Sequence, residues 1–117
     1  MNNIQNIFIL NEKKFYCPVE FTLDVIGGKY KILILNALRS GILRYSELQK
    51  RIPNATSKML TQQLRELEKD GMIHRKVYPV VPPKVEYSLT EKANSLLPTI
   101  HLMAEWGMQF LSVENVQ

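Results

Sequence analysis

The chain has 117 residues, 45% of them hydrophobic, and a formal net charge of +4, which suits one globular domain with a modest core. No apolar run approaches the ~20 residues that span a bilayer, and Ile7–Leu10 is too short for a signal-peptide core. We therefore expect a cytoplasmic protein that does not bind membranes. The single cysteine, Cys17, excludes an internal disulfide and any zinc site with several thiolates from one chain.

The charge is distributed unevenly. Residues 1–38 carry four Lys/Arg and three Asp/Glu, net +1; residues 39–84 carry ten and four, net +6; residues 85–117 carry one and four, net −3. A focused basic segment is typical of a surface that binds a polyanion such as nucleic acid. Charge that only keeps a small protein soluble is the simpler alternative, and the segregation argues against it.

Residues 1–14 are expected to form an N-terminal arm, either extended or a short helical lead-in. Cys17-Pro18 predicts the start of a helix, because the missing N–H of proline costs nothing in a first helical turn. Gly27-Gly28 ends that helix. A second helix, from Lys29 to about Leu38, is apolar on nearly all sides and should lie at the centre of the core.

A short strand over residues 43–45 precedes two helices over residues 46–70. Ser46 and Gln49 have the spacing of a capping box, which predicts a short helix ending at Arg51 or Ile52. Residues 53–55 form a tight turn. The second helix of this pair begins at Thr56 or Ser57 and stops at Gly71. Three leucines at helical spacing form its apolar stripe: Leu60, Leu64 and Leu67. This pattern predicts a helix-turn-helix.

Residues 72–89 read as two strands, with apolar and polar residues alternating in the second, around a proline-rich connection, which predicts a β-hairpin wing. Its basic side is formed by His74, Arg75, Lys76 and Lys84. Residues 90–111 predict a long C-terminal helix with more apolar surface than one protomer needs. We expect it to form a homodimer together with the first helix. The fold class is thus mainly α with a small β-hairpin wing, α+β, in one domain over residues 1–117.

The outer face of the helix that begins at Thr56 or Ser57 carries hydrogen-bond donors and no obligate anion. Gln pairs bidentately with adenine and Arg with guanine, so Gln62 and Arg65 are the expected base readers on double-stranded DNA. Other basic side chains are expected to hold phosphates. The complete predicted DNA-binding set is Ser57, Lys58, Thr61, Gln62, Arg65, Lys69, Arg75, Lys76 and Lys84.

The sequence gives little support for catalysis. Its two histidines, His74 and His101, fall in different predicted elements, and its glycines fit helix ends and turns rather than a phosphate loop. We expect no enzymatic activity, no catalytic residue, no metal and no cofactor. Taken alone, the donor-rich helix also fits an ordinary solvated amphipathic helix; the neighbouring helix, the wing and the charge distribution favour DNA binding.

Cys17 precedes the first helix, where the positive end of the helix dipole favours a thiolate. Lys13 and Lys14 lie close in sequence. A reactive thiol and an inert packing cysteine are both consistent with these residues.

Several motifs together resemble the HxlR-type family of winged helix-turn-helix regulators, relatives of the MarR group. The resemblance covers residues 17–107, although the family more often has Trp where Tyr30 stands. The matching segments are Cys17-Pro18, Gly27-Gly28-Lys29-Tyr30, Tyr45-Ser46-Glu47-Leu48, Ile52-Pro53, Lys58 to Leu67, Pro82 to Thr90 and Glu105-Trp106-Gly107.

The resemblance implies a homodimeric transcriptional regulator on a near-palindromic operator, dimerised through its N- and C-terminal helices. It also implies that Cys17 is a candidate redox-sensing residue, since some members sense electrophiles or disulfide stress through a corresponding cysteine. Two alternatives remain: a non-covalent effector at the dimer interface, lined by Phe15, Tyr16, Met103 and Trp106, and a winged domain that binds a protein partner instead of DNA.

Overall fold

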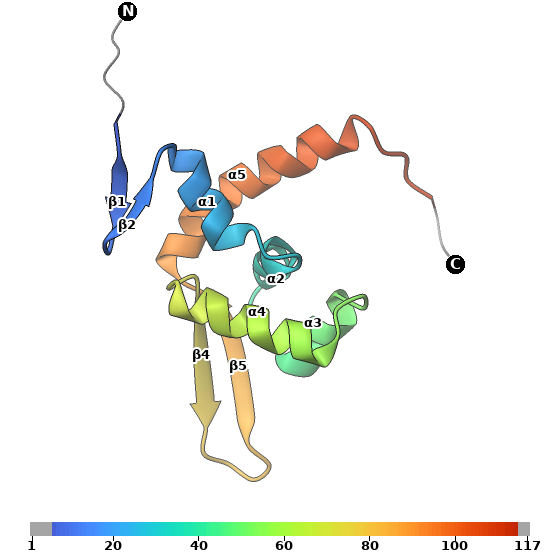
Figure 1. The fold of residues 1–117 in the computed structure, drawn as a ribbon. Helices are drawn as coiled ribbons and strands as arrows, with labels where there is room; N and C mark the ends of the chain where they lie inside the picture. Colours follow the sequence, from blue (N-terminus) through green and yellow to red (C-terminus); the bar gives the residue numbers. More distant parts are fainter. Residues whose placement is uncertain (1–5, 115–117) are drawn as a thin grey trace, which may run out of the picture.

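The computed structural model describes residues 6–114; the first five residues of the predicted arm lie outside this range. The described elements are, in chain order, β1 (Phe8–Leu10), β2 (Lys13–Phe15), α1 (Pro18–Ile26), α2 (Lys31–Leu38), β3 (Leu43–Arg44), α3 (Tyr45–Arg51), α4 (Ser57–Lys69), β4 (Ile73–Tyr78), β5 (Lys84–Leu89) and α5 (Glu91–Met108). Figure 1 shows the β4–β5 wing extending from one end of the helical body and α5 running along the other.

The core lies where α2, α3 and α4 meet. Leu60, Leu64 and Leu67 of α4 are buried, as their helical spacing predicts, and they pack with Ile34 and Leu35 of α2. Burial of a large aliphatic side chain contributes ~1.5–3 kcal/mol, so this leucine stripe holds α4 firmly by its inner face. The outer face of α4 is left available to solvent.

The wing is part of a three-stranded sheet in the order β3-β5-β4. β4 and β5 pair in antiparallel register from Ile73↔Leu89 to Tyr78↔Lys84, which confirms the predicted hairpin. β3 joins through Leu43↔Tyr87 and Arg44↔Glu86, so the short strand before α3 anchors the wing to the helix-turn-helix.

Both ends of α4 match the sequence signals. The Thr56 hydroxyl accepts a hydrogen bond from the Met59 amide at 3.1 Å, and Gly71 has φ +73°, a conformation that favours glycine. The start of α3 differs from the prediction. Its N-cap is Arg44, two residues before the predicted Ser46, so the Glu47 carboxylate rather than Gln49 reaches back and accepts a hydrogen bond from the Arg44 amide at 3.0 Å.

The described part of the N-terminal segment is extended, which is one of the two predicted forms, but it folds back on itself as a β-hairpin that the sequence does not predict. β1 and β2 pair antiparallel with Phe8 opposite Phe15. The turn places Asn11 and Glu12 at positive φ, 49° and 69°, and glutamate is an unusual residue for that conformation. The hairpin docks through Phe15, which is buried with its ring edge-on to Phe21 at 5.6 Å between centroids.

Two helices leave apolar side chains uncovered. On α1, Val19 and Leu23 are 61% and 58% exposed, although the helix buries Val25 and Ile26. The C-terminal half of α5 also exposes large apolar side chains, which are Leu102, Met103, Trp106 and Met108. The helix ends at Met108, three residues before the predicted Leu111. In the described residues, no helix is both long and apolar enough to cross a membrane.

Candidate nucleic-acid interface

A shallow groove runs along the exposed side of α4. Five of the nine predicted contact residues line it, and the only other lining residue is Glu66; the five are Ser57, Lys58, Thr61, Gln62 and Arg65. All five come from a single helix whose opposite face is fixed in the core. The groove therefore presents amide, hydroxyl and cationic donors on a rigid support, the chemistry that recognises base edges and phosphates.

Residues of α3 hold the first turn of α4 in place. The Gln49 side chain donates to the Ser57 hydroxyl at 2.9 Å, and the Tyr45 hydroxyl donates to the Ser57 carbonyl at 3.0 Å. The Tyr45 hydroxyl also lies 3.3 Å from that of Thr61. These bonds cross between helices, so local sequence spacing predicts no such role for Tyr45 and only a capping role for Gln49.

The start of α2 supports the middle of α4. The Tyr30 amide donates to the Gln63 side chain at 2.8 Å, and the Lys31 ammonium lies 2.9 Å from the Glu66 carboxylate. Lys31 is buried, and its hydrogen bond holds the pKa of Glu66 below the ordinary value. The one acidic side chain that lines the groove is thus paired with a cation, which limits its repulsion of a polyanion.

Arg75 extends the interface toward the wing. It lines a second hollow with Thr61 and Arg65 of α4 and with Tyr87, its cross-strand partner. Glu68 and Leu64 complete that hollow. Arg75 and Arg65 therefore lie on one continuous surface formed by α4 and the wing, which places a further cation next to the predicted base readers.

The remaining wing lysines lie on the opposite face of the hairpin. Lys76 and Lys84 flank the Tyr78 ring at 4.9 and 4.8 Å, and Lys84 pairs with Glu86 at 3.4 Å. The hydrogen bond from Tyr78, followed by that from Lys84, lowers the pKa of Glu86. The predicted basic side of His74, Arg75, Lys76 and Lys84 is wrong for Arg75 alone, because consecutive strand residues point to alternate faces and the register places Lys84 on the same face as His74 and Lys76.

Lys69 is separated from the other predicted contacts. It lines a hollow against the N-terminal hairpin, with Leu10, Asn11 and Lys13 among its neighbours. Around the helix axis, Lys69 points in nearly the same direction as Lys58. However, eleven residues at 1.5 Å per residue place it ~16 Å farther along the axis, at the far end of α4.

Cys17 lies exposed between β2 and α1. Its backbone amide and that of Tyr16 both donate to the Glu20 carboxylate at 2.9 Å, so a carboxylate binds the backbone at the start of α1. Lys13, which the sequence places near the thiol, instead pairs with Asp24 at 2.6 Å. No cluster of three or more potential metal ligands occurs within residues 6–114.

The four residues expected to line an effector site do not come together within one chain. Phe15 is buried under the hairpin, and Tyr16 and Met103 are exposed. Trp106 lies near the far end of α5, where its ring is 5.0 Å from that of Phe110. This lining is expected at a dimer interface, so it stays a prediction.

Comparison with known proteins identifies the family. The model of the HxlR-like helix-turn-helix family matches residues 25–115. The HTH-type transcriptional regulator YdeP of Bacillus subtilis is 56% identical over 94 residues, which cover 80% of this chain and 73% of YdeP.

Two solved structures of the redox regulator HypR have the same fold. The oxidised form is 54% identical with a TM-score of 0.78, covering 83% of this chain and 100% of HypR. The reduced form is 54% identical with a TM-score of 0.77, covering 80% of this chain and 92% of the HypR chain. The present chain belongs to the HxlR-like helix-turn-helix family and is a transcriptional regulator of the HxlR/MarR type.

Proposed function

We propose that this regulator binds a near-palindromic DNA operator as a homodimer and reads bases through the outer face of α4. The groove on α4 is the observation that carries this proposal. Four of its five donors are exposed and Thr61 is half-buried, its helix is anchored from behind, and its single carboxylate is paired with Lys31. A helix held in this way fits the major groove, which is wide enough to admit it.

The contacts divide by chemistry. Gln62 and Arg65 read adenine and guanine, and Ser57 and Thr61 supply shorter hydroxyl contacts from the same groove. Lys58 and Arg75 bind DNA phosphates beside α4. Lys76 and Lys84 bind phosphates where the wing contacts the DNA backbone. Lys69 contributes only long-range attraction, because it lies at the hairpin end of the helix.

The exposed apolar faces of α1 and α5 support a homodimer. Val19 and Leu23 on one helix and Leu102, Met103 and Trp106 on the other would be covered by a second copy. A two-fold axis through these helices presents two copies of α4 to one side of the duplex. Half-sites ~34 Å apart, one DNA turn, then follow from the symmetry.

Selection of bound duplexes from a random pool tests this function. We expect recovery of an inverted repeat with half-site centres about 10 base pairs apart. Recovery of random sequences would contradict base reading by α4, and recovery of no duplex at low salt would instead favour a winged domain that binds a protein partner.

We further propose that Cys17 receives a thiol-reactive signal. Its side chain is exposed at the start of α1, which is part of the proposed dimer interface. The similar protein HypR is a redox regulator with structures in oxidised and reduced forms. In the simplest step, the Cys17 thiolate attacks one sulfur of a small disulfide, forms a mixed disulfide and releases the other sulfur as a thiolate.

Operator binding before and after treatment with oxidised glutathione tests this step. Wild type should change its affinity and gain the mass of one glutathionyl group per chain, and both effects should reverse with reductant. Cys17→Ser should show neither effect. An equal response from Cys17→Ser would exclude the thiol as the input and point to a non-covalent effector.

A further inference from the structure

The hollow between α4 and the wing contains a tyrosine whose hydroxyl the fold does not use. Tyr87 lies in β5, the central strand of the three-stranded sheet, opposite Leu43 on one side and Arg75 on the other. Directly opposed residues of antiparallel strands extend from the same face of the sheet. Tyr87 therefore projects on the same face as Arg75, and both residues line the hollow together with Thr61 and Arg65 of α4.

The ring of Tyr87 is part of the core, but its hydroxyl is free. Only 8% of the residue is exposed. The hydroxyls of Tyr30 and Tyr45 each donate to a backbone carbonyl at 3.0 Å, whereas that of Tyr87 has no hydrogen-bond partner within residues 6–114. Every fully buried side-chain N or O atom in the same range has a partner. The Tyr87 hydroxyl is therefore not fully buried, and it reaches solvent in the hollow that the residue lines.

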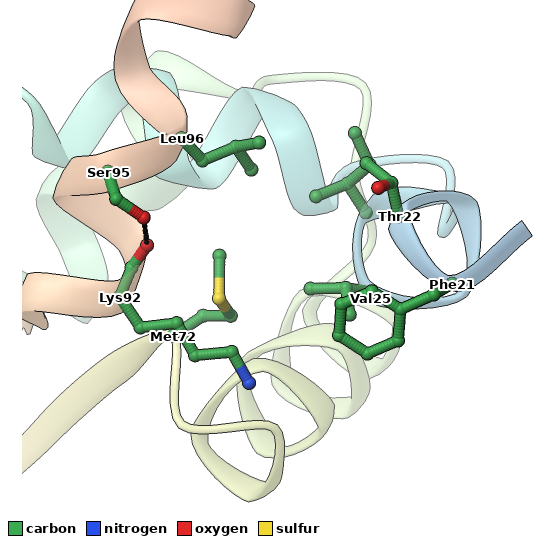
Figure 2. A pocket seen from close by; sticks show the side chains of 8 residues that line it. Phe21, Thr22, Val25, Met72, Lys92, Ser95 and Leu96 are labelled. Atoms are coloured by element: carbon green, nitrogen blue, oxygen red, sulfur yellow. Dashed lines mark hydrogen bonds between the residues drawn. The ribbon is translucent and has the colours of Figure 1, made fainter. Parts of the chain in front are cut away.

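The pocket against Met72, between α1 and α5, offers no comparable donor. Figure 2 shows the Ser95 hydroxyl bonded to the Lys92 carbonyl, at 2.6 Å. The Thr22 hydroxyl of the same pocket donates to the Pro18 carbonyl at 3.3 Å. Both protons are thus used within their own helices, which is not true of the tyrosine hydroxyl beside the wing.

The hollow between α4 and the wing carries a net positive charge. Arg65 and Arg75 line it from two elements and Glu68 is its one carboxylate, so two positive charges and one negative charge leave +1. Neither arginine forms an ion pair within the part of the chain that the structure describes. A guanidinium presents its N–H donors in a planar fork that matches the oxygens of a phosphate. Together with a free hydroxyl, these groups suit one phosphodiester.

The hollow also lies where a DNA backbone is expected. An α-helix with its side chains is ~10–12 Å across and the major groove is ~12 Å wide, so the backbones that form the walls of the groove lie along the flanks of a helix inside it. The hollow flanks α4 on the side of the wing. A phosphate on that wall therefore meets groups from the wing as well as from α4.

We propose that the Tyr87 hydroxyl and the Arg75 guanidinium bind the same DNA phosphate. The hydroxyl donates to one non-bridging oxygen and the guanidinium donates to the other. The Tyr87 ring is fixed in the core, so this contact sets the register in which α4 enters the major groove, while Arg65 reaches the base edges. The inference rests on the proposed DNA-binding function and adds to it a contact residue that strand alternation assigns only to the core.

Fluorescence anisotropy with the selected duplex tests this contact. Tyr87→Phe keeps the ring and removes only the hydroxyl, so it should unfold at the wild-type temperature and yet bind the duplex about tenfold more weakly per half-site. Its slope of log affinity against log salt should equal that of wild type, because no charge is lost, whereas Arg75→Ala should reduce the slope. Tyr16→Phe, which removes a hydroxyl from an exposed ring outside both hollows of α4, should bind as wild type does.

Duplexes that carry a single methylphosphonate, which removes the charge of one phosphate, identify the phosphate that is bound. At one position per half-site, this change should weaken binding by wild type and have little further effect on Tyr87→Phe or on Arg75→Ala. Lys58→Ala, which changes the other side of the interface, should lose its sensitivity at a different position. Thermal unfolding followed by circular dichroism checks that each variant is folded.

Wild-type affinity of Tyr87→Phe would overturn the contact. Sensitivity lost at different positions in Tyr87→Phe and Arg75→Ala would overturn the shared phosphate, and a Tyr87→Phe protein that is weakened without any position-specific loss would show a structural role only. Failure of wild type to bind any duplex refutes the proposed function and this contact with it. Binding by wild type with any of the preceding results refutes this contact alone.

Discussion

Two adjacent glutamines on α4 have different tasks. Gln62 lines the exposed groove, whereas the Gln63 side chain accepts a hydrogen bond from the partly buried Tyr30 amide at 2.8 Å. Gln63→Ala should lower the free energy of unfolding by ~1–3 kcal/mol, because it leaves that amide without its acceptor. Urea denaturation measures this change.

Gln62→Ala is the matched control. It should change stability by less than ~0.5 kcal/mol, since its side chain is on the exposed face, and yet weaken binding of the selected duplex. If Gln62→Ala destabilised the fold as much as Gln63→Ala, the division of the two faces of α4 would be incorrect.

The lysines of the interface should differ in their salt dependence. Lys58 lines the α4 groove, whereas Lys84 already pairs with Glu86 at 3.4 Å. Lys58→Ala should reduce the slope of log affinity against log salt by ~0.9, the value for one phosphate contact. Lys84→Ala should reduce it by less, because Glu86 neutralises part of its charge in the free protein. Equal reductions, measured by fluorescence anisotropy across a salt series, would contradict the role given to Glu86.

The ion pair between Lys31 and Glu66 predicts a pH dependence of stability. The Lys31 hydrogen bond lowers the pKa of Glu66 in the folded state from an ordinary value of 4.5. The pair therefore stabilises the fold above that value, and this stability is lost as the pH falls through the folded-state pKa. Glu66→Gln should flatten the decline in unfolding free energy between neutral and acidic pH. A decline as steep as in wild type would show that other carboxyls cause it.

At the scale of elements, Thr90 joins the wing and α4 to α5. Its hydroxyl donates to the Gly71 carbonyl at 2.7 Å and accepts from the Ala93 amide at 3.2 Å. Thr90→Ala should lower the unfolding free energy by ~1–2 kcal/mol, because it removes a helix cap and an interelement bond together. Thr99→Ala, at an exposed site within α5, serves as the control and should stay within ~0.5 kcal/mol. Indistinguishable denaturation curves for the two variants would refute the bridging role.

Elements with local stop and start signals could be predicted from sequence. Thr56, Gly71 and Thr90 mark their helix ends by their own chemistry, and all three positions are confirmed. The N-terminal hairpin was not predicted, because its strands are three residues long and its turn uses Asn11-Glu12 rather than a glycine pair. Pairing of β3 with β5 depends on residues more than 40 positions apart, which local patterns do not encode.

The same distinction applies to the candidate site. The five α4 residues share one groove because helical periodicity fixes the direction of each side chain. Lys69 is separated by distance along the axis, and Arg75 faces away from Lys76 because strands alternate. Lys31 and Tyr45 support α4 from other helices, so only the folded chain shows their roles.

At the scale of the whole molecule, the α4 groove and the exposed apolar side chains occupy separate regions. The groove lies on α4, and the exposed apolar side chains lie on α1 and the distal half of α5. Figure 1 shows α4 beside the wing, with α1 and α5 above it. This separation allows one copy to contact DNA and a second copy at the same time. The pocket against Met72 lies between the two regions, where α1 and α5 approach the end of α4.

In the proposed homodimer, two symmetry-related copies of α4 read the operator through Arg65. The most direct measurement is selection from a random duplex pool with wild type and Arg65→Ala in parallel. We predict that Arg65→Ala loses a guanine preference at two symmetric positions about one helical turn apart, with a cost of ~1–3 kcal/mol at each. An identical base preference at every position for both proteins would contradict this account.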